Sequence, residues 1–453
     1  MTGKTTQDDA VNIFLAALRD CSVEQGFSRK IGMSAEDDGR VQLHHAGESL
    51  EVTGIRHLRI FAVGKASVEM LRCFLALAER LEACDIQGVL IAGEFPSAVP
   101  AGFAPFTGGH PVPSQGSLDG AAAALALAKE ASTMDDALCV FLVSGGASSM
   151  MEKPLSDEIS LEETQVFYQL LVHSGASIAE INCIRKHFSA VKGGRLALAT
   201  GNTQMLTLFA SDVPPQHLDA LGSGPTLPDP TTVGECRRLL SQYSLNEALP
   251  ESIRKFFASS AVAETPKPGA FATRAWVMLD SEDLAEAAGS EARRLGYHVV
   301  FDHACDDWDY SRAAGYLLER LRSLRLHHVR LCIISTGEVT VRVQAVDCEG
   351  GAPAQSGLGG RNQHFALYCA TLLRSTDEGV TIISAGSDGI DGNSPAAGAV
   401  VTNEMLSSPE RLAEARRALA QFDSFRFLDS VGATVVTGAT GNNLRDLRIF
   451  LVD

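Results

Sequence analysis

The sequence predicts an α/β protein of two domains, each with a mostly parallel sheet flanked by helices. Continuous apolar runs alternate with helical patterns, and glycine-rich or polar turns follow most of the runs. Continuous apolar runs are typical of strands that are buried on both faces, as in parallel sheets. The chain has 453 residues, which is too long for one typical domain.

Six apolar runs have the composition of such strands. They cover residues 59–67, 87–93, 137–149, 205–213, 329–338 and 379–389. Helical patterns such as residues 117–132 lie between them, as expected for a Rossmann-like, doubly wound fold. In such folds ligands bind beyond the carboxyl ends of the strands, and the glycine and polar clusters follow the strands here.

Two interruptions of the alternating strand and helix pattern give the predicted domain boundaries. Residues 223–257 hold four prolines and lead into a helical stretch, and 264–269 is a second loop. We therefore expect an N-terminal α/β domain over 1–240, a helical connector over 241–270 and a C-terminal α/β domain over 271–453.

The first 21 residues have an acidic pair followed by apolar residues at helical spacing, which predicts an amphipathic helix and not a signal peptide. No apolar run reaches the roughly 18 residues of a membrane span. Ten cysteines are scattered without paired spacing, and several lie in apolar runs. They are typical of core residues in a reducing compartment, so we expect a cytoplasmic protein.

The composition limits the classes of partner. The chain is 45% hydrophobic and 21% charged, with a net charge of −17, as in globular proteins of ordinary composition. The charge argues against binding nucleic acid or an anionic membrane, which would repel the protein. It leaves small anionic substrates possible, because local donors can outweigh a distant field.

In the first half, two turns have the residues of an anion site. Lys65 stands between a predicted strand and helix, where it is either a solvated lysine or a cation at a helix start. A strand then ends in a run of glycines and hydroxyl residues that favours phosphate oxygens over a simple helix cap. The members of this run are Ser144, Gly145, Gly146, Ser148 and Ser149.

A second group follows. Residues 181–197 carry four cations around a glycine pair, among them Lys192. Asp212 comes at a strand end, where it is either a cap or a ligand of Mg²⁺ near phosphates. Another set of candidate donors contains Gly222, Ser223, Gly224 and Thr226.

The second half repeats the theme. Asp388 and Asp391 lie in a glycine-rich turn after a strand and suit a metal or a general base, although such turns are common in any case. The stretch 357–370 places Arg361 directly after three glycines, at the start of a predicted helix. Zinc-ligand spacings and a dinucleotide-binding GxGxxG are absent from the sequence.

Together these segments resemble the glycerate 2-kinase family, whose C-terminal part is called the MOFRL domain. The matching stretches run in order along nearly the whole chain and include "VGKAS", "SGGASSM", "INCIRKHFSAVKGGRLA", "SGPTLPDPTT", "GLGGRNQHFAL", "GSDGIDGNSPAAGAV" and "TGATGNNLRDL". The resemblance implies ATP- and Mg²⁺-dependent transfer of a phosphoryl group to the 2-hydroxyl of D-glycerate. It also implies two α/β domains that face each other across a cleft, in a monomer or homodimer.

The resemblance places the family's functional residues on Lys65, Arg361, Asp388 and Asp391. Arg361 would contact the glycerate carboxylate or the γ-phosphate, and Lys65 would supply a compact charge. Asp388 would be the base or a Mg²⁺ ligand, and Asp212 a second metal candidate. The turns at 144–149 and 222–224, with Lys192 and Thr226, would hold the ATP phosphates.

Four positions depart from the family pattern: Ser114, Pro215-Gln216, His364 and Pro395. Two other functions remain open from the sequence. One is a hydroxypyruvate or related 2-hydroxyacid reductase, against which the missing dinucleotide motif argues. The other is a non-catalytic sensor of anionic metabolites on the same scaffold, which retention of Lys65 and both aspartates disfavours.

Overall fold

A computed structural model describes residues 6–35, 40–81, 84–95, 98–260, 262–342 and 357–453. It divides into two compact units. The first unit is Val23–Leu279, and the second unit combines the residues up to Ser22 with Asp280–Asp453. The two-domain α/β architecture predicted from the sequence is thus confirmed.

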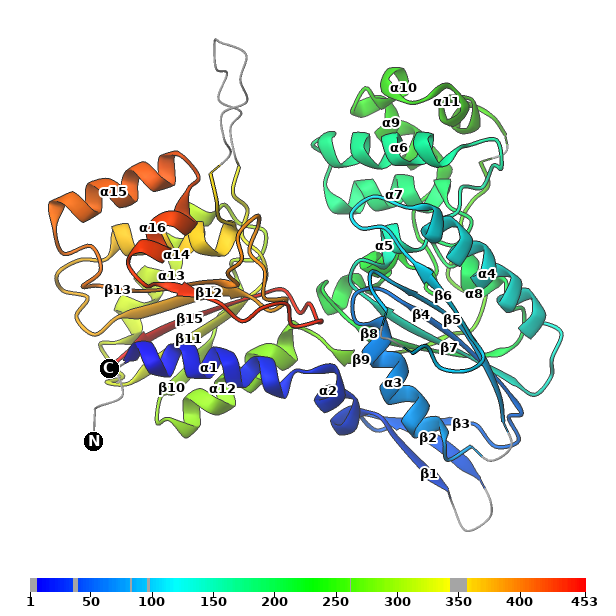
Figure 1. Ribbon diagram of the computed structural model, residues 1–453, viewed down its shortest axis with the longest axis horizontal. Helices are drawn as coiled ribbons and strands as arrows, with labels where there is room; N and C mark the ends of the chain where they lie inside the picture. Colours follow the sequence, from blue (N-terminus) through cyan, green and yellow to red (C-terminus); the bar gives the residue numbers. More distant parts are fainter. Residues whose placement is uncertain (1–5, 36–39, 82–83, 96–97, 261, 343–356) are drawn as a thin grey trace. The chain divides into compact units, whose positions relative to one another are not determined.

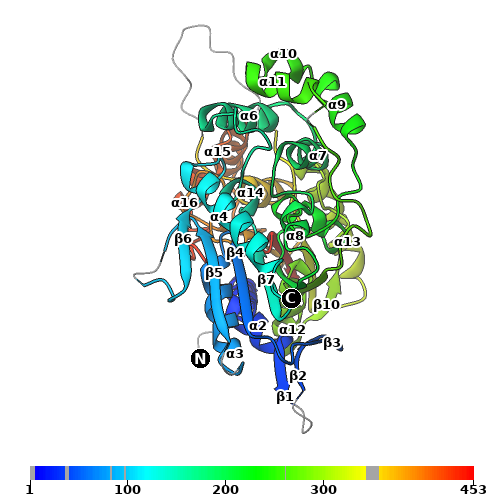
Figure 2. The ribbon, with the colours of Figure 1, turned by 90° about the vertical axis from the view of Figure 1, so that its right-hand side faces the viewer.

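The first unit is built on a six-stranded parallel sheet in the order β6-β5-β4-β7-β8-β9. The strands β6, β5, β4 and β7 are seen in this order in Figure 2. Its strands are β4 (His57–Val63), β5 (Asp85–Ala92), β6 (Phe103–Thr107), β7 (Ala137–Ser144), β8 (Gln204–Ala210) and β9 (Arg274–Leu279). Every neighbouring pair is parallel. The four apolar runs predicted as strands in this half are strands here.

Helices cover both faces of this sheet because the chain reverses direction across it. α3 (Ser67–Ala78) connects β4 to β5 on one side, and α4 (Gln115–Ala131) carries the chain back across to β7. Right-handed crossovers that run in opposite directions place their helices on opposite faces. The strand order therefore switches between β4 and β7, which is where ligands bind in doubly wound folds.

Smaller elements complete the first unit. They are α2 (Val23–Lys30), the antiparallel strands β1 (Gly32–Ala35), β2 (Val41–His45) and β3 (Glu48–Glu51), the short helices α5 (Ala147–Met150) and α8 (Arg195–Leu198), and the 3-10 segment η1 (Pro215–Ser223).

A helical layer with its own core belongs to the first unit too. It contains α6 (Leu161–His173), α7 (Ile178–Phe188), α9 (Val233–Gln242), α10 (Leu245–Ala248) and α11 (Glu251–Ala258). Phe167, Phe188 and Phe257 pack together at its centre, with Phe167 and Phe188 ring centroids 4.3 Å apart. The predicted helical connector over 241–270 is therefore wrong, because the apolar face of α11 is buried against α6 and α7.

The second unit has a six-stranded mixed sheet in the order β10-β11-β15-β12-β13-β14. Its strands are β10 (His298–Phe301), β11 (Leu331–Thr336), β12 (Thr381–Gly386), β13 (Gly398–Thr402), β14 (Thr434–Val435) and β15 (Asp446–Val452). β10, β11, β12 and β14 run in one direction, while β13 and β15 run in the other. The two runs predicted as strands in this half are β11 and β12, and they run in the same direction. Neighbouring strands are nevertheless mostly antiparallel, because β15 lies between β11 and β12.

Helices enclose this second sheet on both faces (Figure 1). α1 (Thr6–Asp20) and α12 (Ser281–Arg294) pack on one face, and α1 contacts β12, β13 and β15. The other face carries α13 (Tyr310–Leu324), α14 (Arg361–Leu372), α15 (Pro409–Ala420) and α16 (Ser424–Ser430).

The predicted domain boundaries are wrong at both ends for the same physical reason. α1 is the amphipathic helix expected at the N-terminus, but its apolar face is buried with the C-terminal sheet and not with residues 23–240. β9 was expected in the C-terminal domain and is instead the edge strand of the first sheet, hydrogen-bonded to β8. The position of α1 and β9 in the sequence does not predict which sheet each one packs on or pairs with, because that depends on contacts with residues far away in the chain.

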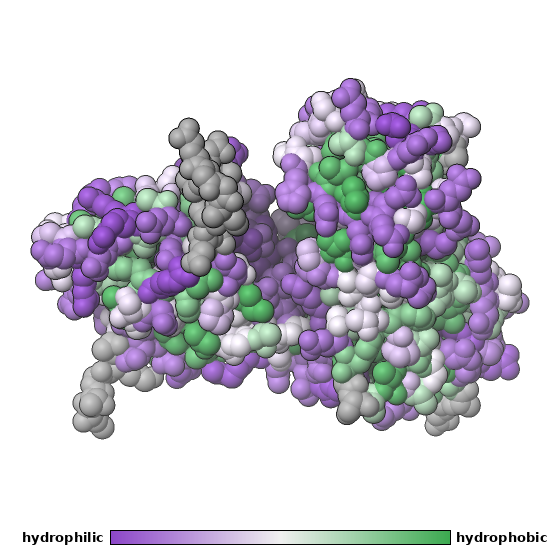
Figure 3. All heavy atoms as spheres, turned by 45° about the horizontal axis from the view of Figure 1, so that its top comes forward, coloured by the Kyte–Doolittle hydropathy of each residue, from purple (hydrophilic) through white to green (hydrophobic). Residues whose placement is uncertain are grey.

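The outer surface is largely hydrophilic on the face seen in Figure 3. Among the described residues, no helix is long and apolar enough to cross a membrane. The nine described cysteines are free thiols, and all but Cys84 are buried, as the sequence predicted. Cys348 lies outside the described residues.

The packing of α1 predicts the effect of shortening one core side chain. Phe14 is fully buried, so Phe14→Ala is expected to lower the free energy of unfolding by about 3–5 kcal/mol. Urea unfolding followed by circular dichroism measures this change. Arg19→Ala, at an exposed position of the same helix, is the control, and an equal effect of both substitutions would contradict the assignment of α1 to the second unit's core.

Candidate functional site

The first cluster of candidate residues follows three neighbouring strands at the switch point. Lys65 comes after β4, Ser144 ends β7 and Asp212 comes after β8. The carboxyl ends of these parallel strands lie at one edge of the sheet. The structure therefore brings these three predicted residues together.

Short contacts hold the turns after β4 and β7 against each other. The Lys65 backbone N–H donates to the Gly145 carbonyl at 2.9 Å, and the Ala66 N–H donates to Ser144 Oγ at 3.0 Å. A Cβ atom on Gly145 would overlap the carboxylate of Asp212. The glycine is thus required for Asp212 to lie on the turn, and a phosphate held at the turn would be within reach of that carboxylate.

Lys65 and His110 flank the remaining glycine of this turn. A Cβ on Gly146 would lie 3.4 Å from Lys65 Cγ and 3.1 Å from His110 Cδ2. Burial lowers the pKa of His110, and the Lys65 charge lowers it further. Near neutral pH this imidazole is uncharged, so the exposed Lys65 is the cation of the turn.

The second predicted turn is joined to the first through side chains. Ser148 Oγ and Ser223 Oγ are 2.8 Å apart, and Ser223 Oγ donates to Asn182 Oδ1 at 2.9 Å. Ser223 and Thr226 are fully buried, so their hydroxyls do not face open space as predicted. Of the two turns, the partly exposed residues are Gly146, Ser148 and Gly222.

The buried neighbours of these residues support the turns from behind. Ser144, Gly145, Ser149 and Gly224 are all buried. The Gly224 carbonyl accepts from the Gly194 N–H at 2.7 Å, which ties the second turn to the segment before α8. These buried residues hold the backbone of the two turns in place.

Lys192 is not available to a phosphate in this structure. It is fully buried, and its Nζ lies 2.8 Å from Glu152 Oε2 and 3.0 Å from the Met151 carbonyl. Burial lowers the pKa of Lys192, while Glu152 acts in the opposite direction. The Tyr168 hydroxyl also donates to Glu152. The structure gives Lys192 a structural ion pair in place of the predicted nucleotide contact.

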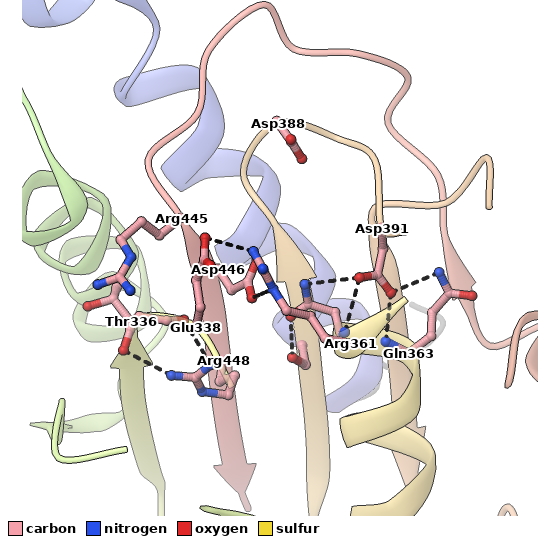
Figure 4. A network of polar contacts seen from close by, with 12 residues as sticks. Thr336, Glu338, Arg361, Gln363, Asp388, Asp391, Arg445, Asp446 and Arg448 are labelled. Carbon is pink, nitrogen blue, oxygen red and sulfur yellow. Dashed lines mark hydrogen bonds and ion pairs between the residues drawn. The ribbon is translucent and has the colours of Figure 1, made fainter. Parts of the chain in front are cut away.

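The second cluster surrounds Arg361 at the edge of the other sheet (Figure 4). Arg361 Nε donates to Asp446 Oδ2 at 2.6 Å, and Nη2 lies 3.2 Å from Asp446 Oδ1 and 2.8 Å from Glu338 Oε1. Burial lowers the pKa of Arg361, but the two carboxylates outweigh burial and raise it. The side chain is 37% exposed, so a ligand can reach the guanidinium.

The two predicted aspartates of this cluster have different environments. Asp388 is partly exposed, and its Oδ1 accepts from the Ile390 N–H at 3.2 Å. Asp391 is buried, and its oxygens accept from the backbone N–H groups of Asn362 and Gln363 at 3.1 and 2.9 Å. Burial raises the pKa of Asp391 to about 6, although these N–H groups lower it.

Asp391 therefore caps the first turn of α14, the helix that begins with Arg361. Both of its oxygens also accept from the side-chain amides of Asn362 and Gln363. Orphan N–H groups at a helix start need such acceptors. The geometry makes Asp391 a positioning residue for Arg361, in place of the predicted catalytic contact.

The sequence reasoning missed Asp446 and Glu338, which neutralise Arg361. The available signal was an aspartate at the start of the buried strand 446–452, since a buried carboxylate requires a partner. Arg448 in the middle of that strand was a second signal. It is fully buried and donates to the carbonyls of Thr336 and Gly337, both at 2.9 Å, so it holds the segment that leads to Glu338.

We tested the residues present for their fit to a divalent metal ion. Within the described part of the chain, no group of three His, Cys, Asp or Glu side chains could hold a metal ion by itself. Mg²⁺ is commonly bound by one or two carboxylates together with substrate phosphates and water. Asp212, lying on the glycine turn, fits that pattern, and Asp388 is a second carboxylate at a strand end.

Two family models match most of the chain. Residues 9–258 match a family described as a domain of unknown function (DUF4147), and residues 331–446 match the MOFRL family. A D-glycerate 2-kinase from Thermotoga maritima is 31% identical over 412 residues, covering 89% of this chain and 93% of its own.

Two further relatives bear on function. A putative hydroxypyruvate reductase from Agrobacterium vitis is 32% identical over 400 residues, covering 87% of this chain and 86% of its own. The crystal structure of a glycerate kinase from Thermotoga maritima superposes with a TM-score of 0.80 at 27% identity, covering 99% of both chains.

The contact between Gly360 and Asp391 gives a testable consequence. A Cβ on Gly360 would overlap the Asp391 carboxylate, so Gly360→Ala is expected to displace the helix cap and lower the free energy of unfolding by about 1–3 kcal/mol. Gly315→Ala in α13, where a Cβ meets nothing within 4 Å, is the matched control. Helix propensity predicts that Gly315→Ala raises the free energy of unfolding by about 0.5–1 kcal/mol. Denaturant titration measures both variants, and an equal change in their free energies of unfolding would contradict the argument.

Proposed function

Because the chain belongs to the glycerate kinase family of phosphotransferases, we propose that it transfers the γ-phosphoryl group of ATP to the 2-hydroxyl of D-glycerate. The products are 2-phosphoglycerate and ADP. The observation that carries the proposal is the turn at the β4/β7 switch point, where Lys65, Gly146, Ser148 and Asp212 surround one stretch of backbone. Phosphoryl transfer depends on positioning and charge neutralisation, which are what these groups offer.

The nucleotide phosphates are assigned to the first unit. Gly146, Ser148 and Gly222 offer the exposed positions of the two joined turns, and the Lys65 ammonium is the compact charge beside them. Backbone turns of this kind suit anions because consecutive N–H groups point outwards. His110, being uncharged near neutral pH, accepts or donates one hydrogen bond without adding charge.

Mg²⁺, when bound, would neutralise phosphate oxygens during transfer. Asp212 is the residue of the first unit that would hold it. Asp388 is the alternative metal ligand. The carboxylate that does not bind the metal would be the base that accepts the proton of the substrate hydroxyl.

The acceptor is assigned to Arg361 and Asp388. Arg361 Nε and Nη2 are held by Asp446 and Glu338, so the guanidinium is fixed in direction while part of it stays exposed. It binds the glycerate carboxylate or a transferring phosphate oxygen through the remaining N–H groups. The oxygen of the 2-hydroxyl bonds to the γ-phosphorus while the bond between that phosphorus and the ADP oxygen breaks. Asp388 accepts the proton that the hydroxyl loses.

A reductase is the second candidate, since one relative is named a putative hydroxypyruvate reductase. The sequence lacks the GxGxxG motif that reductases with a dinucleotide use after their first strand. The turn after β4 has Ala66 where the second glycine of such a motif would stand. A non-catalytic sensor would need none of the carboxylates around Arg361.

The reaction itself is the first test. The purified protein with ATP, Mg²⁺ and D-glycerate is expected to form a product that enolase converts directly to phosphoenolpyruvate, without added mutase. Product that requires mutase would contradict the 2-position. Oxidation of NADH with hydroxypyruvate would support the reductase, and ADP binding without turnover would support the sensor.

Removal of the Lys65 charge is the second test. Lys65→Met is expected to lower kcat/KM by at least about 100-fold, because a charge aimed at phosphate oxygens contributes about 3 kcal/mol to transition-state stabilisation. Since Lys65 is exposed, the melting temperature should stay unchanged. Lys129→Met, an exposed lysine at the end of α4, should keep full activity; equal losses in both variants would contradict the assigned role.

A further inference from the structure

Arg185 is a buried arginine that lacks an ordinary partner. It lies in the last turn of α7 and is 8% exposed. Its Nε is buried without a hydrogen-bond partner. Within the described residues, no carboxylate pairs with its guanidinium and no oxygen accepts from it. Its guanidinium covers the Tyr168 ring, whose centroid is 4.4 Å from Cζ.

Two other buried arginines have acceptors for their Nη groups, although the Nε of each also lacks a hydrogen-bond partner. Arg59 is 1% exposed and lies 3.0 Å from Asp85 Oδ2 and 3.2 Å from Glu130 Oε1. Arg448 is fully buried and donates to two carbonyls and a hydroxyl. A guanidinium stays charged under all conditions of interest, so it cannot escape the cost of burial by losing its proton. Arg185 therefore has a charge and donors for which the described residues supply no acceptor.

Two routes connect Arg185 to the phosphate-binding turns. Along α7, Arg185 is three residues after Asn182, which accepts from Ser223. The second route runs through Tyr168, whose ring the guanidinium covers. The Tyr168 hydroxyl lies 3.0 Å from the Ser148 carbonyl. Ser148 and Ser223 share a hydrogen bond at 2.8 Å. Arg185 is thus separated from each of the two turns by one residue, Tyr168 on the side of Ser148 and Asn182 on the side of Ser223.

The charges around Arg185 leave a local positive excess. Lys192 and Glu152 form a fully buried ion pair, with Nζ and Oε2 2.8 Å apart. Tyr168 is neutral, because burial and the neighbouring Glu152 raise its pKa well above the usual value. Glu152 Oε1 is buried without a partner of its own, so a water-bridged contact from Glu152 to Arg185 is the competing explanation that the test must exclude.

We propose that Arg185, with Ser148, forms a subsite that binds an oxyanion of one of the two substrates. The ligand group is a phosphate of the nucleotide or the carboxylate of the hydroxy acid, both of which fit the planar fork of a guanidinium. The subsite deepens the function proposed above and rests on it. Its residues are separate from Lys65 and Arg361, which the sequence singled out.

The test is Arg185→Met in the full chain, which keeps the aliphatic volume and removes the charge. We expect KM or the calorimetric Kd to rise at least 10-fold for one substrate. A rise for ATP and ADP assigns the phosphate, and a rise for D-glycerate assigns the carboxylate. Because the charge is uncompensated without ligand, the melting temperature of the substrate-free variant should be equal to or higher than that of the wild type.

Arg59→Met is the matched control, a buried arginine near the start of β4 in the same unit. It should leave both affinities unchanged and lower the melting temperature, since it removes a paired charge. If Arg185→Met lowers the melting temperature and changes neither affinity, Arg185 is structural and the proposal is overturned. Unchanged affinities with an unchanged melting temperature overturn it as well.

Failure of the subsite and failure of the proposed reaction are distinguishable. If the wild type binds ADP or D-glycerate by calorimetry but shows no turnover, the kinase proposal fails while the affinity comparison still tests Arg185. If the wild type turns over and the variant has wild-type KM values, the reaction stands and the subsite fails.

Discussion

Compensation of buried charge is the constraint on which the rest of this structure depends. The buried carboxylate of Asp446 is held by Arg361, Lys192 by Glu152, and Asp391 by the N–H groups at the start of α14. Each arrangement fixes a side chain in one direction, because leaving either partner alone in a dry interior would cost several kcal/mol. Among the described residues, no carboxylate pairs with the buried guanidinium of Arg185, and the anion proposed above would supply that partner.

The glycines of "GLGGRNQ" follow from the same constraint. Gly360 leaves room for the Asp391 carboxylate to reach the first turn of α14, and Gly359 has a φ of +142°. The glycines thus bring an acidic side chain of the protein to the helix start, where a ligand could have been expected. The ligand-binding consequence is indirect: the capped helix presents Arg361 in a fixed direction.

The departures from the family pattern are compatible with the fold. Ser114 caps α4 by accepting from the Ser117 N–H, a task that serine and aspartate perform equally well. His364 is buried and stacks on Phe422, and burial lowers its pKa to about 4. It is therefore a neutral residue in the interior of the second unit. Pro395 is exposed beside the turn that holds Asp391.

The sequence by itself determined the strands, the turns that follow them and the side chains that carry charge at those turns, because apolar runs and glycine clusters are local signals. It placed Lys65, Ser144 and Asp212 correctly at strand ends, and parallel pairing then brings them together. Only the tertiary structure decided which surface α1 and β9 cover, which carboxylates neutralise Arg361, and that Lys192, Ser223, Thr226 and Asp391 face inwards. These outcomes depend on contacts between residues up to hundreds of positions apart. The local sequence around a polar residue is the same whether its side chain contacts a ligand or another part of the chain.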